Sequence, residues 1–371
     1  MSFSKFQIFN FLFKLSCVIT ASSMVIYWIM KFHQNMDQDS IEYVQLENVT
    51  NFVYPELSIC VYAPFFQTSF NNSKENISID DYQQFLVGNR APNSAYRNIE
   101  FNNVTIDLFE YFKELKIQWN NDTPYICNDR DNCPFAKFKN SFNGFLHIGR
   151  LFKCFSVEPY SDDSRVIIGM WLLFEPHLVS ALSKINEYRP IAVTINYPNQ
   201  FLRNIEDFRY IWLEDKKTQR SYNAFKITHI ELIQRRFKEK DPCFEDWRNY
   251  DQKLLQKHIE SVDCKPPYLT SNKSLCITKQ EMRDSVYNLR NVRQKYPKPC
   301  HEITNIAFTS HYYRTRSIKD AYNDYIGLRV VYPGNVKLIK QSQLVDIHSL
   351  IGNIGGYIGL FLGKYYWRRH V

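Results

Sequence analysis

The nine cysteines are the residues of the sequence with the clearest potential for chemistry. Cys17 lies in an apolar run near the N-terminus, and the remaining eight form an even set, as a disulfide framework requires. These disulfide candidates are Cys60, Cys127, Cys133, Cys154, Cys243, Cys264, Cys276 and Cys300. No pair has Cys-x-x-Cys spacing and no paired histidines follow, so we expect disulfides and no metal site. If all eight pair, 105 connectivities remain open.

N-glycosylation sequons are the second chemical signal. Six Asn-x-Ser/Thr sequences lie between the two apolar ends of the chain. The candidate acceptors are Asn48, Asn71, Asn76, Asn103, Asn121 and Asn272. Together with the cysteines, they indicate that the central region is lumenal or extracellular.

Enzymatic motifs are missing from the sequence. It contains no Gly-x-Ser-x-Gly, no His-Glu-x-x-His and no phosphate-binding glycine-rich loop after a strand. His301 beside Cys300 could suggest a nucleophile pair, but we expect Cys300 to form a disulfide. Adjacent acids such as Asp80 and Asp81 are typical of solvated turns. We therefore expect no enzyme and no cofactor.

Composition narrows the class of protein further. Of 371 residues, 44% are hydrophobic and 23% charged, which excludes intrinsic disorder. A mean hydropathy of −0.40 excludes a chain that lies mostly in the membrane. The net charge is +8, but basic residues alternate with acids, as in residues 239–241, so we expect no nucleic-acid partner.

The N-terminal segment predicts a membrane-spanning helix. Residues 15–30 carry no charge, and these sixteen residues make about 24 Å of helix. The flanking Lys14 and Lys31 can snorkel, which extends the predicted span to residues 11–32. A cleaved signal peptide is the alternative, since residues 21–23 are small. We favour the span because Tyr27 and Trp28 resemble an interfacial belt.

The region between residues 33 and 345 has an α+β pattern. Residues 52–65, 165–174 and 188–197 predict strands, and residues 66–146 predict loops with short helices. A helical period appears between Cys243 and Cys264 and again over residues 279–296, with prolines between them, so we expect a helical hairpin braced by disulfides. Strands return over residues 304–336.

Glycines dominate the last apolar segment. Five of the 11 glycines lie in the last twenty residues. Gly352, Gly356, Gly359 and Gly363 recur at intervals of four, three and four, which places them on one helix face where several backbones could approach a common axis. Each glycine lowers helix stability by about 1 kcal/mol relative to alanine, so five glycines in one segment indicate that something requires them there.

This segment resembles the start of the second transmembrane segment of the degenerin/epithelial sodium channel family. The family pattern is Ile-Gly-Gly-x-x-Gly-Leu-Phe-hydrophobic-Gly, and residues 354–363 match it. Residues 54–60 resemble the first palm strand, Cys243 through Cys276 the disulfide-braced thumb, and the stretch from Cys300 to Gln343 the last palm strands. The similarity covers residues 52–65 and 242–363, and residues 149–154 show a weaker similarity.

The resemblance implies an α+β membrane protein with two membrane helices, a large disulfide-rich palm-and-thumb ectodomain and a trimeric pore. We expect a cytoplasmic segment at residues 1–10, a first span at 11–32, an extracellular domain at 33–345 with a thumb at about 243–299, the start of a second span at 346–363, and a divergent tail at 364–371. It also implies an amiloride-sensitive, non-voltage-gated channel with Na⁺ as the permeant ion, located in the plasma membrane as a multi-pass homo- or heterotrimer with related subunits.

Pore roles are carried over only at matching positions. Gly352 matches the outer pore mouth, where bulky residues hold such channels open, and Asn353 stands where many members have an acid. Gly363 matches the first residue of the Gly-x-Ser selectivity filter, but Lys364 and Tyr365 follow it here. A trimer would place three ammonium groups at the filter, and such a ring repels cations, so we expect the subunit to be non-conducting or modulatory.

The tail admits two interpretations. In the favoured one, the sequence is truncated or alternatively spliced after Gly363. In the other, residues 350–364 form a short span of about 21 Å with an aromatic and basic inner end. The His-Gly pair that the family carries before its first span is absent from residues 1–10. A second class of function also stays open: a secreted or single-span ligand-binding glycoprotein derived from a channel ectodomain.

Overall fold

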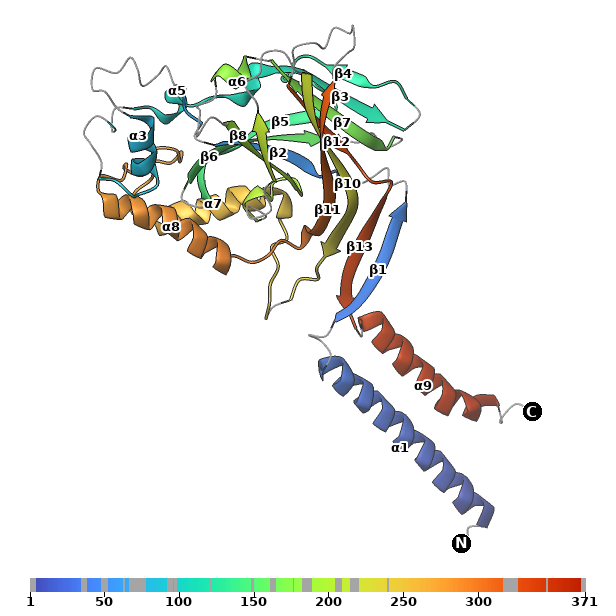
Figure 1. Ribbon diagram of the computed structural model, residues 1–371. Coiled ribbons are helices and arrows are strands. Elements are labelled where there is room, and N and C mark those ends of the chain that lie inside the picture. The colour runs from blue at the N-terminus through green and yellow to red at the C-terminus, as the bar shows by residue number, and fades with distance from the viewer. Residues whose placement is uncertain are drawn as a thin grey trace. The chain divides into compact units, whose positions relative to one another are not determined.

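The computed structural model describes most of the chain (Figure 1). The described residues are 5–34, 39–47, 53–62, 64–66, 78–91, 96, 99–120, 122–147, 150–160, 165–175, 177–181, 189–203, 209–213, 220–238, 240–315, 326–344 and 346–367. They form two compact units. The smaller unit comprises Met1–Tyr43, Lys238–Lys240 and Ile339–Val371, and the larger comprises Val44–Phe237 and Asp241–Leu338.

The smaller unit contains two helices and parts of two strands. The helices are α1 (Lys5–Gln34) and α9 (Ile347–Trp367). The strands are β1 (Asp39–Glu47) and β13 (Asn335–Gln343), both of which continue into the larger unit. Inside the smaller unit the Ser40 and Ser342 hydroxyls lie 2.6 Å apart, and Lys238 pairs with Asp39 at 2.6 Å.

The larger unit is built on two β-sheets. One has the order β5-β6-β2-β8-β9, and the other the order β1-β13-β10-β12-β7-β3-β4 with β11 paired to β10. The strands of the first sheet are β5 (Ala136–His147), β6 (Arg150–Pro159), β2 (Glu56–Tyr62), β8 (Arg189–Asn196) and β9 (Arg209–Leu213). The others are β3 (Phe112–Trp119), β4 (Tyr125–Cys127), β7 (Ile167–Phe174), β10 (Arg220–Gln234), β11 (His301–Thr315) and β12 (Ile326–Val331).

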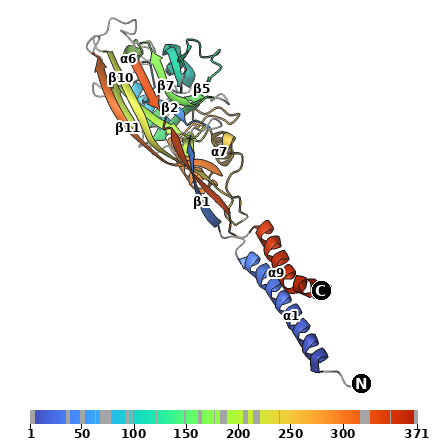
Figure 2. The ribbon, with the colours of Figure 1, turned by 90° about the vertical axis from the view of Figure 1, so that its right-hand side faces the viewer.

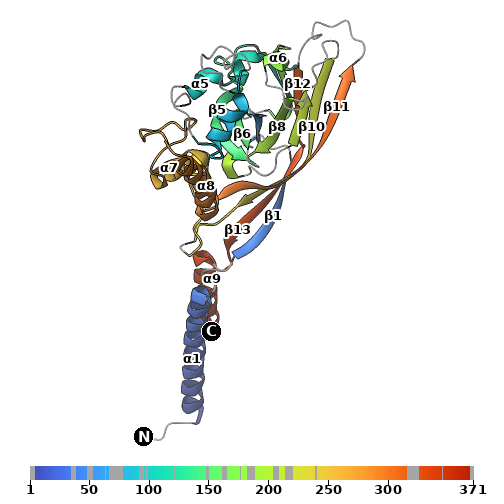
Figure 3. The ribbon, with the colours of Figure 1, turned by 60° about the vertical axis from the view of Figure 1, so that its left-hand side comes forward.

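Helices complete the larger unit. The longer ones are α3 (Ile79–Leu86), α7 (Tyr250–Ser261) and α8 (Lys279–Lys295). The shorter ones are α5 (Phe101–Val104), α6 (Leu178–Ala181), η1 (Leu108–Tyr111), η2 (Phe201–Arg203) and η3 (Trp247–Asn249). Helices α7 and α8 lie side by side (Figure 3), as the helical period predicts. Thr278 and Glu281 form a capping box that begins α8.

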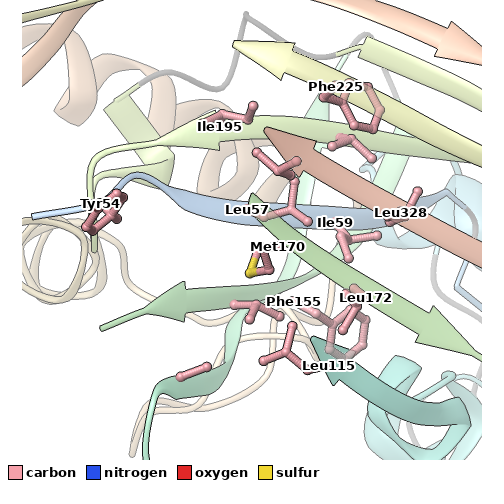
Figure 4. Close-up of a cluster of buried hydrophobic side chains, with 14 of the residues drawn as sticks. Tyr54, Leu57, Ile59, Leu115, Phe155, Met170, Leu172, Ile195, Phe225 and Leu328 are labelled. Carbon is pink, nitrogen blue, oxygen red and sulfur yellow. The ribbon is translucent and has the colours of Figure 1, made fainter. Parts of the chain in front are cut away.

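Strand β2 lies between two hydrophobic clusters. All seven of its residues are buried. Leu57 and Ile59 enter a cluster between the two sheets, which includes Leu115 and Met170 (Figure 4). Cys60 and Tyr62 face the other cluster, which contains side chains from α3, α7 and α8. A strand covered on both faces reads as a continuous apolar run, and this explains why residues 52–65 predict it well.

The prediction of short helices within residues 66–146 is confirmed by α3, α5 and η1, but the prediction of loops for the rest of this range is wrong where strands form. Strands β3, β4 and β5 lie there. In β3 the side chains of Leu115, Ile117 and Trp119 are buried and alternate with Glu114 and Lys116. Half of such a strand is polar, so the segment has a low average hydrophobicity although its period is two.

All eight candidate cysteines form disulfides in the structure. The pairs are Cys60–Cys154, Cys127–Cys133, Cys243–Cys300 and Cys264–Cys276. Cys60 and Cys154 are direct partners in the register of β2 and β6. Cys243–Cys300 and Cys264–Cys276 brace the segments that flank α7 and α8. Cys17 is a free cysteine.

Gly88 controls the contact between the end of α3 and helix α8. Its φ of +74° lies in the left-handed region, and a Cβ built there would lie 2.7 Å from the Cα of Arg283. A side chain at this position is therefore opposed both by backbone strain and by contact with backbone atoms that cannot rotate away.

We expect Gly88→Ala to lower the free energy of unfolding by about 1–3 kcal/mol. Gly334→Ala is the matched control, because no atom lies within 4 Å of a Cβ at Gly334 and no left-handed φ is required there. Denaturant unfolding of the two variants measures the difference. Equal stabilities would contradict the close α3–α8 contact.

Candidate functional site

Helix α1 has the length and composition of a membrane span. Among the described residues, Phe11–Gln34 is the one segment that passes this test, with a mean hydropathy of 1.6. Large apolar side chains, including Phe11, Leu12, Val18, Ile19 and Ile26, are exposed on the isolated chain. A soluble surface rarely carries such an apolar area, so α1 is suited to lipid.

Polar groups of α1 are arranged to suit an apolar surrounding. The hydroxyls of Thr20 and Ser23 donate hydrogen bonds to the carbonyls of Ser16 and Ile19, each at 2.8 Å. Their hydrogen-bonding needs are thus met inside the helix. Near the end of the helix, Lys31 Nζ lies 4.8 Å from the ring centroid of Trp28. This is a cation–π contact, which partly compensates the lysine charge near the end of the span.

One face of α9 packs against α1. The two helices are in contact and lie side by side (Figure 2). On α9 the half-buried residues are Leu350, Asn353, Ile354 and Tyr357, spaced three, one and three apart as one helix face requires. On α1 the covered residues Cys17, Ala21, Met24 and Trp28 have the same kind of spacing.

The glycines of α9 lie on a different face. Gly352, Gly356 and Gly359 are exposed, and a Cβ built at any of them meets no atom within 4 Å. At 3.6 residues per turn, they lie roughly opposite the face that packs against α1. Gly355 is also exposed with open space around it. The predicted glycine face is therefore uncovered in the isolated chain.

Other predicted pore residues separate from the glycine face. Asn353 is half-buried on the side of α9 that packs against α1. The backbone of α9 continues as a helix past Gly363 to Trp367, so Lys364 and Tyr365 extend the helix. In helical register these two positions fall on the side of Leu350 and Asn353. Their side chains lie outside what the structure describes.

Two of the predicted glycosylation sites lie in the described residues. Asn103 in α5 is exposed, and its Nδ2 donates to Glu100 Oε2 at 2.8 Å. Asn272 is exposed inside the loop closed by the Cys264–Cys276 disulfide. The other four acceptors, Asn48, Asn71, Asn76 and Asn121, lie outside the described residues.

The sequence analysis missed a buried polar cluster in the larger unit. Its centre is Glu56, which is 1% exposed in β2. Ser58, Ser156, Thr194 and Asn196 are buried around it, and Asn196 Nδ2 donates to Ser58 Oγ at 3.3 Å. A carboxylate inside the apolar run 53–62 was the available signal, because a charge in a fully buried strand needs a partner.

Solved structures that are similar to this chain include a proton-activated chloride channel and Erv41p. No family model and no curated protein sequence matches the chain. A proton-activated chloride channel is 8% identical, with a TM-score of 0.27 over 99% of this chain and 97% of that chain. Erv41p is 7% identical, also with a TM-score of 0.27, over 81% of this chain and 99% of that chain. TM-scores this low do not establish a shared fold or function.

The α1–α9 contact can be tested at Ala21, which is 7% exposed. We expect Ala21→Trp to separate the helices, because overpacking costs about 1–3 kcal/mol and raises the separated fraction at least about fivefold. Cys17 lies on the same face of α1, so its reaction with a lipid-soluble maleimide should accelerate by a similar factor. Ser22→Trp, on the exposed side, is the control. Equal rates in the three proteins would rule out this packing.

Proposed function

We propose that the chain is a subunit of a multimeric membrane ion channel in which α1 and α9 cross the bilayer and α9 lines the pore. Residues 33–345 form the extracellular domain, with the sheets as a palm and α7–α8 as a thumb. The permeant ion is Na⁺, the current is amiloride-sensitive and not voltage-gated, and neither enzymatic activity nor a cofactor is part of the function. The observation that carries the proposal is the uncovered glycine face of α9.

The glycine face supports assembly around an axis. Each glycine costs about 1 kcal/mol in a helix, and packing within the chain does not compensate, because no atom lies near these positions. Small residues allow helix backbones to approach closely inside a membrane. A second and third copy, or related subunits, at this face would provide the missing contacts. We therefore propose a homo- or heterotrimer in the plasma membrane.

The end of α9 supports a modulatory role within such a channel. The family filter has a serine two residues after its first glycine, whereas Lys364 and Tyr365 follow Gly363 here. The filter serine is thus missing here, although in helical register Lys364 itself falls on the side of α9 that packs against α1 and not on the glycine face. We propose that the chain conducts weakly or not at all alone and assembles with a conducting relative.

We expect Gly359→Leu to weaken assembly, because the added side chain holds neighbouring helices apart. A loss of about 1.4 kcal/mol lowers the association constant about tenfold. Subunit counting by single-molecule photobleaching in lipid nanodiscs measures it. Leu360→Ile is the neighbouring control on a residue that is 64% exposed. Unchanged oligomers in Gly359→Leu would exclude this face as the interface.

Voltage-clamp recording tests conduction. We expect no amiloride-sensitive sodium current from the chain alone and an altered current when it is co-expressed with a conducting relative. A current that appears only after Lys364→Ala and Tyr365→Ser would support an inactive pore. Repeated absence of any effect on current, alone and with relatives, would argue against a channel subunit.

A single-span ligand-binding glycoprotein is the alternative function. The observation in its favour is that α1 alone among the described helices passes the length and hydropathy test for a span. Protease accessibility discriminates between the two. A C-terminal tag protected from external protease in intact cells requires α9 to cross the membrane, whereas an accessible tag favours the alternative.

A further inference from the structure

The loop between α7 and α8 carries one of the predicted glycosylation sequons. The loop is closed by the disulfide between Cys264 and Cys276, and the sequon lies at residues 272–274. Lys265 N donates to the carbonyl of Ser274 at 2.9 Å, and Cys276 N donates to the carbonyl of Lys265 at 3.0 Å. The sequon therefore lies on a loop that is held by a disulfide and by backbone hydrogen bonds.

Lys273, the middle residue of this sequon, attaches the loop to α7. Its Nζ donates to the carbonyl of Val262 and to that of Glu260, the latter at 3.4 Å. Both carbonyls lie at the C-terminal end of α7, where the last carbonyls have no partner inside the helix and a positive charge is favourable. The backbone N–H of Lys273 also donates to Ser271 Oγ at 3.2 Å. The lysine side chain is thus directed to the helix.

The residues on either side of Lys273 are exposed. Asn272 and Ser274 are both exposed, whereas Ser271 and Lys273 are half-buried. Neither the Asn272 amide nor the Ser274 hydroxyl bonds to another residue that the structure describes. Glycan transfer needs both groups, because the amide nitrogen receives the sugar and the hydroxyl belongs to the recognised sequence. The folded loop thus presents the complete sequon to solvent.

The sequon at Asn103 lacks this arrangement. Asn103 Nδ2 donates to Glu100 Oε2 at 2.8 Å, and Thr105, which carries the hydroxyl of this sequon, is 2% exposed. Thr105 Oγ1 accepts a hydrogen bond from the buried Lys153 Nζ at 3.1 Å. A transferase could therefore not reach this hydroxyl in the folded chain. Of the two sequons in the described residues, the fold keeps the one at Asn272 accessible.

Two exposed apolar side chains follow Asn272 in the chain. Leu275 is 38% exposed and Ile277 is 51% exposed, and the buried Cys276 lies between them. The backbone N–H of Ile277 donates to Glu281 Oε2 at 2.8 Å, which holds Ile277 at the beginning of α8. Five residues span at most about 18 Å, so both apolar side chains lie within reach of a branched oligosaccharide on Asn272.

We propose that Asn272 carries an N-linked glycan that covers Leu275 and Ile277. Asn272 Nδ2 forms a bond to the anomeric carbon of a lipid-linked oligosaccharyl diphosphate, the bond from that carbon to the diphosphate oxygen breaks, and the amide proton passes to the departing lipid diphosphate. The glycan is bulky and hydrated, so this surface faces water and not another subunit. The inference rests on the extracellular location of residues 33–345 in the proposed function, and it does not depend on whether the chain conducts ions.

Mass spectrometry of the full chain from eukaryotic cells tests the modification. Enzymatic release of N-glycans in heavy-oxygen water converts each occupied asparagine to a labelled aspartate. We expect this label at Asn272 and its loss in Ser274→Ala. Arg293→Thr creates a control sequon at Asn291, which is exposed on α8. A label at Asn291 without one at Asn272 would overturn the inference and leave the extracellular location intact, whereas a chain without any label would overturn both.

Hydroxyl-radical footprinting of the full chain in lipid nanodiscs tests the covering. We expect Asn272→Gln to raise the oxidation rates of Leu275 and Ile277 several-fold, because their side chains lose the glycan. Ile168 in β7 is 42% exposed and should keep its rate, which controls for the radical dose. Asn103→Gln is the matched variant and should leave Leu275 and Ile277 unchanged. Equal rates at these two residues in the wild type and in Asn272→Gln would overturn the covering.

Discussion

Burial of both faces of strand β2 is the constraint on which the larger unit depends. Leu57 and Ile59 pack between the two sheets, while Cys60 and Tyr62 pack in the cluster that contains side chains from α3, α7 and α8. A slip of one residue would exchange these two sets and place the disulfide partner Cys154 out of register. The register of β2 thus determines the packing of the two sheets, the Cys60–Cys154 disulfide and the position of α3, α7 and α8.

The membrane-type helices follow a different rule. In α1, apolar side chains and internally bonded hydroxyls make a surface that lipid can solvate. In α9, one face is occupied by α1 and the glycine face is left open. Without a covering helix, four glycines would weaken α9 in water by about 4 kcal/mol. In lipid the backbone has no water to bond with, so the helix persists, and the open face becomes available for another helix.

How much of this could be predicted from the sequence depends on where the signal lies. Strand β2 was predicted from its apolar run and helices α7 and α8 from their helical period, and the spacing of the glycines predicted the glycine face. Strand β3 was missed because its polar residues lower the average hydrophobicity of the segment, although its second half alternates with buried residues. The pairing of Cys60 with Cys154 could not be chosen among the connectivities, because it depends on the register of β2 and β6 rather than on spacing. Membership in the degenerin/epithelial sodium channel family remains a hypothesis, carried by residues 354–363.

Glu56 shows why a buried charge is hard to interpret from sequence alone. Its neighbours in the run 53–62 predict an apolar strand, and nothing nearby in the chain identifies its partners. Its ion-pair partner Lys139 and the like-charged neighbours Glu158 and Asp251 come from three separate elements that only the fold brings together. An apolar residue in place of Glu56 would avoid the desolvation cost, but it would leave Lys139 and the Asn199 N–H without this acceptor. Burial of the Glu56 carboxyl group therefore costs desolvation energy in β2. In return, the group accepts a hydrogen bond from Asn199, whose carbonyl bonds to the first turn of α7. The position of α7 thus depends on a charged group as well as on apolar packing.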